Sequence, residues 1–87
     1  MIYALSFSKQ AFKELEKINE PFYSKLKQVI INLSLNPRPQ GYIKLKGREG
    51  FRIRVGDYRI IYNIFDKLLV IDIITVGNRR DVYESRD

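Results

Sequence analysis

Three arginines stand close together in the stretch FRIRVGDYRIIY, where Arg52, Arg54 and Arg59 alternate with apolar residues. This alternation predicts two strands joined by a turn at Gly56-Asp57. Directly opposed residues share a face, so one side of the hairpin is apolar and the other carries the arginines. Arg54 then lies opposite Arg59, which is unfavourable unless an anion lies over the pair. The spacing therefore predicts an anion-binding face that is open to solvent.

A second basic group follows in the stretch VGNRRDVY. Arg79 and Arg80 can each hold a phosphate through two parallel hydrogen bonds, and Tyr83 adds a titratable hydroxyl. Two simpler interpretations stay open for these residues. Arg80 and Asp81 can form an ordinary surface pair, and Tyr83 can close the core as a terminal aromatic residue.

The two basic groups converge if the strand before the second group pairs with the hairpin. A two-residue turn at Asp66-Lys67 would place Ile74 opposite Arg59, with Arg79 only a few residues further along the chain. We therefore expect Arg79 to lie near the arginines of the hairpin.

Several kinds of catalytic site are disfavoured by composition. The chain has no histidine and no cysteine, so the commonest general base and the commonest transition-metal ligands are both missing. Asp57, Asp66 and Asp81 fall in or beside predicted turns, where aspartate has a conformational role. We expect neither a metal site nor a small-molecule cofactor, and a metal-dependent nuclease is disfavoured.

Basic residues are concentrated in the middle of the chain. The net charge is +6 overall and +5 across 38–59 alone, which fits a nucleic acid or an acidic protein as partner, although a solvated surface is the simpler interpretation. The N-terminus lacks the pattern of a signal peptide, and apolar runs such as LLVI are too short to span a bilayer. We therefore expect a cytoplasmic protein that does not bind membranes.

Hydrophobic periodicity predicts a single α+β domain over 1–87. A strand at 2–7 precedes a helix from about Lys9 to Ile18, capped by Ser8. A second helix begins near Pro21 and ends before NPRPQG. Apolar stripes on these helices are predicted to face the sheet, and their members are Ala11, Phe12, Leu15, Ile18, Phe22, Leu26, Val29, Ile30 and Leu33. Strands at 42–46, 51–55, 58–65 and 68–76 complete a mainly antiparallel four-stranded sheet beneath the helices, with Tyr58 and Tyr62 on the core face. The last strand alternates poorly, which predicts that it is covered on both faces.

The order of elements, together with IKLKG, FRIRVGDYRIIY and ITVGNRRDVY, resembles the RelE/ParE superfamily of toxins from type II toxin–antitoxin systems. The likeness covers nearly the whole chain, and the blocks at 51–62 and 75–83 carry its specific part. The sequence is most similar to the RelE branch, whose members cut messenger RNA on the ribosome. The resemblance implies a RelE-like fold, a cognate antitoxin as partner, and the ribosome and mRNA as targets. We expect the antitoxin to carry an acidic segment that meets the basic region.

Residue roles follow from the same resemblance. It implies catalytic roles for Arg59, Arg79 and Tyr83. Tyr83 is the available acid or base, although its ordinary pKa of about 10 is high for a base, and Glu49 is a second candidate. The resemblance also implies that Arg52 and Arg54 take part, and we expect these two to contact RNA and phosphate. Apart from the resemblance, we expect further RNA and phosphate contacts from Lys44, Lys46, Arg48 and Arg80. Two alternatives stay open, namely a ParE-like inhibitor of DNA gyrase without catalysis and a plain RNA-binding module.

Overall fold

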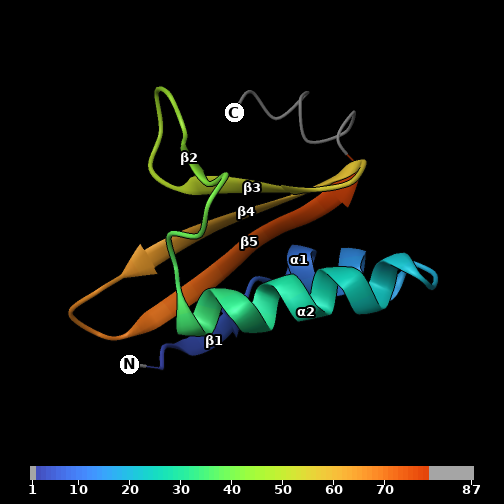
Figure 1. Ribbon diagram of the computed structural model, residues 1–87, viewed down its shortest axis with the longest axis horizontal. Coiled ribbons are helices and arrows are strands. Elements are labelled where there is room, and N and C mark those ends of the chain that lie inside the picture. The colour runs from blue at the N-terminus through green and yellow to red at the C-terminus, as the bar shows by residue number, and fades with distance from the viewer. Residues whose placement is uncertain (1, 79–87) are drawn as a thin grey trace.

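The computed structural model describes residues 2–78 and has two layers, with two helices lying against one face of a twisted sheet (Figure 1). Its elements are β1 (Ala4–Phe7), α1 (Lys9–Glu16), α2 (Phe22–Leu35), β2 (Ile43–Lys44), β3 (Phe51–Val55), β4 (Tyr58–Phe65) and β5 (Val70–Asn78). The predicted α+β class is confirmed. Within the described range, no helix combines the length and the apolar character needed to cross a membrane.

The sheet has five strands in the order β1-β5-β4-β3-β2, one strand more than predicted. The N-terminal strand β1 joins the sheet by pairing with β5 in parallel, while the other neighbouring pairs are antiparallel. Two backbone hydrogen bonds fix its ends. The Ala4 N–H donates to the Leu69 carbonyl over 2.7 Å, and the Ser8 N–H donates to the Ile73 carbonyl over 2.9 Å. At the opposite edge, β2 is shorter than the predicted strand at 42–46.

Helix α1 begins where the sequence predicts because Ser8 caps it. The Ser8 Oγ accepts a hydrogen bond from the Ala11 N–H over 3.0 Å and donates one to the Ile74 carbonyl over 2.7 Å, which ties α1 to β5. Ala11 and Leu15 are buried, as predicted. Phe12 is instead 54% exposed, so its predicted place in the core is wrong. It lies about 100° around the helix axis from Ala11, outside the narrow stripe that this short helix presents to the sheet.

Helix α2 lies beside α1 on the same face of the sheet (Figure 1). Leu26, Ile30 and Leu33 are buried and confirm the predicted apolar stripe. Phe22 is at the exposed end of this stripe, where its ring packs against the Tyr58 ring with centroids 5.4 Å apart. The helix therefore covers the sheet along its length and leaves one aromatic residue at its start partly in solvent.

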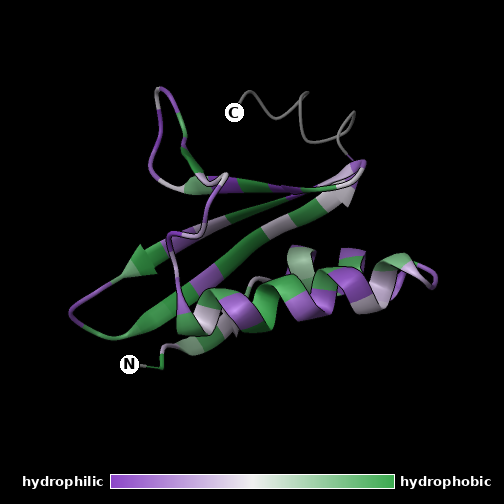
Figure 2. Cartoon of the chain, in the orientation of Figure 1, coloured by the Kyte–Doolittle hydropathy of each residue, from purple (hydrophilic) through white to green (hydrophobic). Residues whose placement is uncertain are grey.

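The main core lies between the helices and the sheet, and a smaller apolar cluster lies on the opposite face. The smaller cluster consists of Leu45 and Ile61, with Ile74 packed against them. Figure 2 shows hydrophobic residues along much of β4 and β5, a mixture of hydrophobic and hydrophilic residues around α2, and hydrophilic ones along the loop that follows β2. The buried residues of the main core are Ala11, Leu15, Leu26, Ile30, Leu33, Ile60, Tyr62, Ile71, Ile73 and Val76.

The turn between β4 and β5 is longer than predicted. Residues 66–69 form it, so Phe65 pairs with Val70 and the two-residue turn predicted from the sequence is wrong. The register along the two strands changes with it. Arg59 lies opposite Gly77, not opposite Ile74.

A β-bulge in β5 explains why this strand alternates poorly in sequence. The pairing with β4 shifts by one residue, and Ile74 is left as the extra residue of β5. Ile71, Ile73 and Val76 consequently all face the helices. Without the bulge, Val76 would lie on the face opposite to Ile71 and Ile73. The predicted coverage of β5 on both faces is found locally, where Ile74 packs into the smaller cluster.

Candidate functional site

The hairpin of β3 and β4 has the register that the sequence predicts. Val55 lies opposite Tyr58, and Arg54 lies opposite Arg59. Gly56 closes the turn with a φ of 61°, a left-handed conformation that glycine adopts without steric cost. The apolar face of the hairpin packs on the main core, so the arginines occupy the other side of the sheet.

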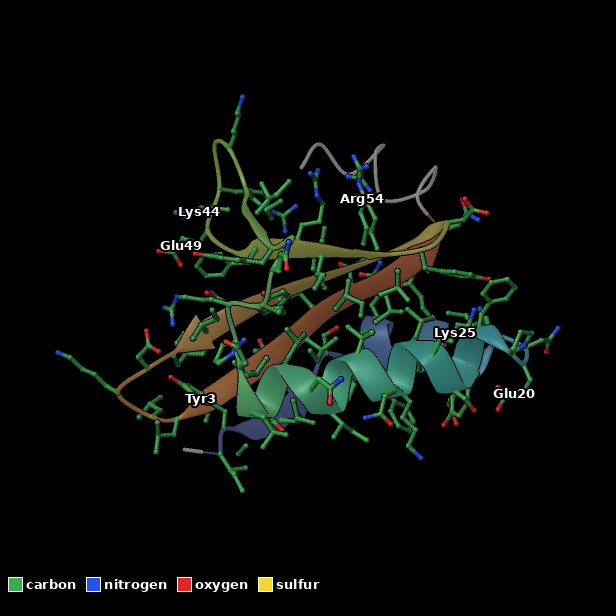
Figure 3. The ribbon with its side chains drawn as sticks, viewed as in Figure 1. Tyr3, Glu20, Lys25, Lys44, Glu49 and Arg54 are labelled. Atoms are coloured by element: carbon green, nitrogen blue, oxygen red, sulfur yellow. The ribbon has the colours of Figure 1, made fainter. Side chains whose placement is uncertain are left out.

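We call this other side of β3 and β4 the arginine face, defined by Arg52, Arg54 and Arg59. Figure 3 shows Arg54 pointing away from the helices. Arg52 and Arg54 are two residues apart on β3 and therefore about 6–7 Å apart along the strand. Arg59 lies on the next strand, β4, with Gly77 on its other side in β5. The three positions thus form one basic surface across two neighbouring strands.

Exposure falls steeply across the arginine face. Arg54 is exposed, Arg52 is partly buried, and Arg59 has no exposed surface at all. The prediction that this face is open to solvent is therefore wrong for Arg59.

The β2–β3 loop, residues 45–50, projects from the edge of the sheet (Figure 1). Its base is closed by a hydrogen bond from the Leu45 N–H to the Gly50 carbonyl over 3.0 Å. Lys46, Arg48 and Glu49 are exposed along it. The loop therefore presents two of the predicted RNA-contacting cations beside the arginine face, and Glu49 with them.

Lys44 lies at the edge of the sheet, next to the ring of Phe51. It pairs with Phe51, whose ring packs against the main core, and its Nζ lies 5.3 Å from the centroid of that ring. This distance is within the range of a cation–π interaction. The structure therefore brings Lys44 to the helix side of the sheet edge, while Arg52 is on the arginine face.

Arg79, Arg80 and Tyr83 lie outside the described residues. The last described strand nevertheless ends at the same end of the hairpin as the Arg54–Arg59 pair, because Asn78 pairs with Tyr58. Within residues 2–78, no three histidine, cysteine, aspartate or glutamate side chains come together as metal ligands would.

A polar cluster that the sequence analysis missed fixes the chain before β2. Asp66 accepts a hydrogen bond from the Tyr3 hydroxyl over 2.7 Å. It also forms an ion pair with Arg38, with an N–O distance of 2.9 Å. We call Tyr3, Arg38 and Asp66 the clasp. No motif could reveal it, because Arg38 and Asp66 are 28 positions apart and Tyr3 and Asp66 are 63 apart.

Burial and hydrogen bonding shift the pKa values of groups around this segment. Hydrogen bonds from the Arg38 guanidinium, which has the larger effect, and from the Tyr3 hydroxyl lower the pKa of the Asp66 carboxyl. The hydrogen bond between Tyr3 and Asp66 also raises the pKa of Tyr3. The Tyr62 hydroxyl donates to the Pro37 carbonyl over 2.7 Å inside the protein, and burial raises the pKa of Tyr62 to about 12. Tyr62 is thus a buried structural donor, as its predicted place in the core implied.

Residues 5–83 match the family model described as ParE toxin of the type II toxin–antitoxin system parDE. The mRNA interferase toxin RelE of Escherichia coli K12 is 30% identical over 90 residues, which cover 98% of this chain and 94% of that protein. The chain therefore belongs to the RelE/ParE superfamily of type II toxin–antitoxin toxins.

Solved structures agree with this membership. The RelE–RelB complex of the archaeon Pyrococcus horikoshii matches with a TM-score of 0.80 and 32% identity, covering 91% of this chain and 97% of that one. The isolated E. coli RelE toxin matches with a TM-score of 0.77 and 30% identity, covering 95% of this chain and 93% of that one. The RelE-like fold predicted from the sequence is confirmed by both.

Proposed function

We propose that this chain is a ribosome-dependent mRNA endonuclease, the toxin of a toxin–antitoxin pair. The observation that carries the proposal is the arginine face, built by Arg52, Arg54 and Arg59 in a chain that matches a named mRNA interferase over nearly its full length. Guanidinium groups suit this role because they bind phosphate oxygens through paired hydrogen bonds. Ribosomes and mRNA are the proposed targets, so the proposed site of action is the cytoplasm.

The proposed chemistry uses a nucleophile that RNA supplies. The 2′ oxygen of one nucleotide attacks the adjacent phosphorus, a 2′ oxygen–phosphorus bond forms, and the bond to the 5′ oxygen of the next nucleotide breaks. The proton of the 2′ hydroxyl must go to a base, and the departing 5′ oxygen must receive a proton. The protein then has to align the strand, stabilise charge on the phosphorane and move two protons. This reaction needs no metal ion.

We assign charge stabilisation to Arg59 and Arg79, and proton transfer to Tyr83. Arg52 and Arg54 hold the phosphates on either side of the reacting bond. Glu49 is the second candidate for the base. RNA backbone contacts beyond the reacting nucleotides are proposed for Lys44, Lys46, Arg48 and Arg80.

The burial of Arg59 adds a condition to its role. A phosphate can contact this guanidinium only if RNA binding uncovers it. Once a phosphate reaches the guanidinium, the interaction is strong because the surroundings have a low dielectric constant. We therefore propose that productive binding includes a rearrangement around Arg59, which an aligned strand on the ribosome would favour.

An antitoxin is the proposed protein partner. The archaeal neighbour and E. coli RelE have both been solved with their antitoxins. In this chain the net charge of +5 across 38–59 favours a partner segment with acidic residues.

One alternative function has a specific observation in its favour, since the matching family model is named for ParE. Purified protein should be incubated with ribosomes on a defined mRNA, with the same mRNA alone, and with gyrase and relaxed plasmid. We expect cleavage on ribosomes, little cleavage of naked mRNA, and unchanged supercoiling. Inhibited supercoiling without cleavage would instead identify a ParE-like toxin, and RNA binding alone would identify a plain RNA-binding module.

Two substitutions test the assigned roles. Arg79→Ala removes a charge stabiliser, and Tyr83→Phe keeps the ring but removes the hydroxyl. Each should lower ribosome-dependent cleavage by roughly 10²–10³ at an unchanged melting temperature, the size expected for losing one transition-state donor. Lys67→Ala, at the exposed β4–β5 turn, is the matched control and should cleave normally. Full cleavage by both Arg79→Ala and Tyr83→Phe would mean that the active site lies elsewhere.

A further inference from the structure

A cavity of about 370 Å³ lies at the β2 edge of the sheet, beside the arginine face. We call it the β2 pocket, and its lining residues are Ile43, Lys44, Leu45, Lys46 and Arg52. Its volume is in the range of pockets that take small organic groups. None of the roles assigned above requires a cavity here, because a phosphate on a flat row of arginines needs none.

The walls of the β2 pocket combine apolar surface with cations. Leu45 is only 5% exposed and packs with Ile61, so the floor is rigid and apolar. Ile43 is 48% exposed and lies directly opposite Arg52 in the sheet. Lys46 adds a second positive charge at the start of the exposed loop. The pocket thus offers apolar side chains and a guanidinium within one small volume.

This combination selects among ligands. A phosphate alone would gain nothing from the isoleucine and leucine walls, and an apolar peptide side chain would gain nothing from the cations. A nucleobase attached to its phosphate uses both, because bases stack on apolar side chains and guanidinium planes while the phosphate pairs with cations. The outer side of β2 also has no neighbouring strand within the described residues, so backbone groups there can meet a base edge.

We propose that the β2 pocket binds a nucleobase of the mRNA next to the phosphate held on the arginine face, and so contributes to the sequence preference of cleavage. Arg52 belongs to both surfaces, and Arg54 is about 6–7 Å further along β3. A base in the pocket and its own phosphate on the arginines therefore belong to one nucleotide. The inference rests on the proposed nuclease function and adds to it a determinant of specificity.

Binding to the free protein gives the first test. Isotope-labelled protein is titrated with each of the four ribonucleoside 3′-monophosphates and, separately, with ribose 5-phosphate. Nucleotides should shift the methyl signals of Ile43 and Leu45, and ribose 5-phosphate should not. Ile43→Trp fills the pocket and should abolish those Leu45 shifts, whereas Leu35→Trp, an exposed position on α2, should leave them unchanged. Equal shifts with ribose 5-phosphate would overturn the proposal.

Cleavage preference gives the second test, on ribosomes that carry an mRNA containing all codons. Filling the pocket with Ile43→Trp should change the relative cleavage of codons by about tenfold or more, the size that a reshaped pocket produces. Ile43→Ala enlarges the pocket and should weaken the preference, which keeps the test valid if the tryptophan variant folds poorly. The control Leu35→Trp should keep the wild-type pattern.

These outcomes distinguish a failure of the pocket assignment from a failure of the proposed nuclease function. A wild-type protein that cuts nothing on ribosomes overturns the proposed function and the pocket assignment with it. A wild-type protein that cuts, with both Ile43 variants keeping its codon pattern, overturns only the pocket assignment.

Discussion

Single residues of one type have different roles here because their neighbours differ. Arg54 and Arg59 are directly opposed on one hairpin face, yet Arg54 is exposed and Arg59 is completely buried. An exposed guanidinium can attract and hold RNA at little cost, while a buried one has lost its hydration and interacts strongly with any charge that reaches it. This difference supports assigning Arg54 to binding and Arg59 to the reacting phosphate.

The buried hydroxyl of Tyr62 leads to a prediction about the free energy of unfolding and its dependence on pH. Tyr62→Phe keeps the ring but loses the hydrogen bond to the Pro37 carbonyl, so the free energy of unfolding at pH 7 should fall by about 0.5–1.5 kcal/mol. In the wild type, the folded pKa of about 12 exceeds the unfolded value of about 10. Stability from Tyr62 is therefore complete below pH 10 and is lost between about pH 10 and 12.

Urea unfolding of both proteins from pH 7 to 12 measures this effect. The difference between wild type and Tyr62→Phe should shrink above pH 10, because the variant has no group to deprotonate at this position. Tyr23→Phe removes a tyrosine hydroxyl on α2 and serves as the control. A constant difference up to pH 12 would contradict the assignment of the raised pKa to Tyr62.

At the scale of elements, the short strand β2 depends on tertiary contacts. Two residues of pairing with β3 are too few to hold a strand by themselves. The chain before β2 is fixed at Pro37 by Tyr62, and at Arg38 by the clasp. After β2, Gly50 has a φ of 120°, and a Cβ there would lie 3.3 Å from the Tyr62 carbonyl oxygen, so only glycine fits this approach of loop to sheet. These contacts position the β2 pocket beside the arginine face.

The clasp should make stability depend on acid pH. The folded pKa of the Asp66 carboxyl is lowered, so its contribution is present above the unfolded value of about 3.9 and is lost as the pH falls through the folded value. Asp66→Asn should lower the melting temperature at pH 7 by only a few degrees, because the pair is exposed and screened by salt. At low pH, after Asp66 is protonated, the two proteins should melt together.

Melting curves of wild type and Asp66→Asn between pH 2 and 7 test this prediction. Glu16→Gln removes one exposed carboxylate of α1 and controls for the change in net charge. A difference between wild type and Asp66→Asn that stays constant to pH 2 would rule out the clasp as its source.

At the scale of the whole molecule, the uneven charge is the dominant feature. The chain has a net charge of +6, and the region at 38–59 contributes +5 of it, with most of its cations on the arginine face and the β2–β3 loop. A surface of this kind speeds association with RNA or with an acidic protein, and the rate falls as salt rises. The same surface serves both proposed partners, so the antitoxin and mRNA should compete for it.

Competition gives the prediction at this scale. Expression of the chain alone should stop growth, and coexpression of the antitoxin should restore it. In vitro, the association rate of antitoxin and toxin should fall steeply with added salt, while the dissociation rate changes little. Replacing Lys46 and Arg48 with alanine should reduce the salt dependence, and replacing Lys9 and Lys13 of α1 is the matched control. A chain that is harmless when expressed alone would contradict its role as a toxin.

The sequence by itself determined the local structures. The hairpin register was predictable because alternation with period two and a Gly-Asp turn fix which residues face each other over a few positions. The start of α1 was predictable because Ser8 is a capping residue directly before an apolar stripe. The set of three arginines on one face followed from the same alternation, so the binding half of the candidate site was predictable as well.

Only the tertiary structure decided features that depend on distant segments. The sequence leaves the length of the β4–β5 turn and the bulge at Ile74 undetermined, because packing on the helices and on Leu45 selects them. The complete burial of Arg59 is also a tertiary property, because alternation along β4 gives the face on which its side chain lies but not how far that side chain is covered. The clasp and the parallel β1 join residues far apart in the chain, and pairings of this kind leave no local pattern in a single sequence.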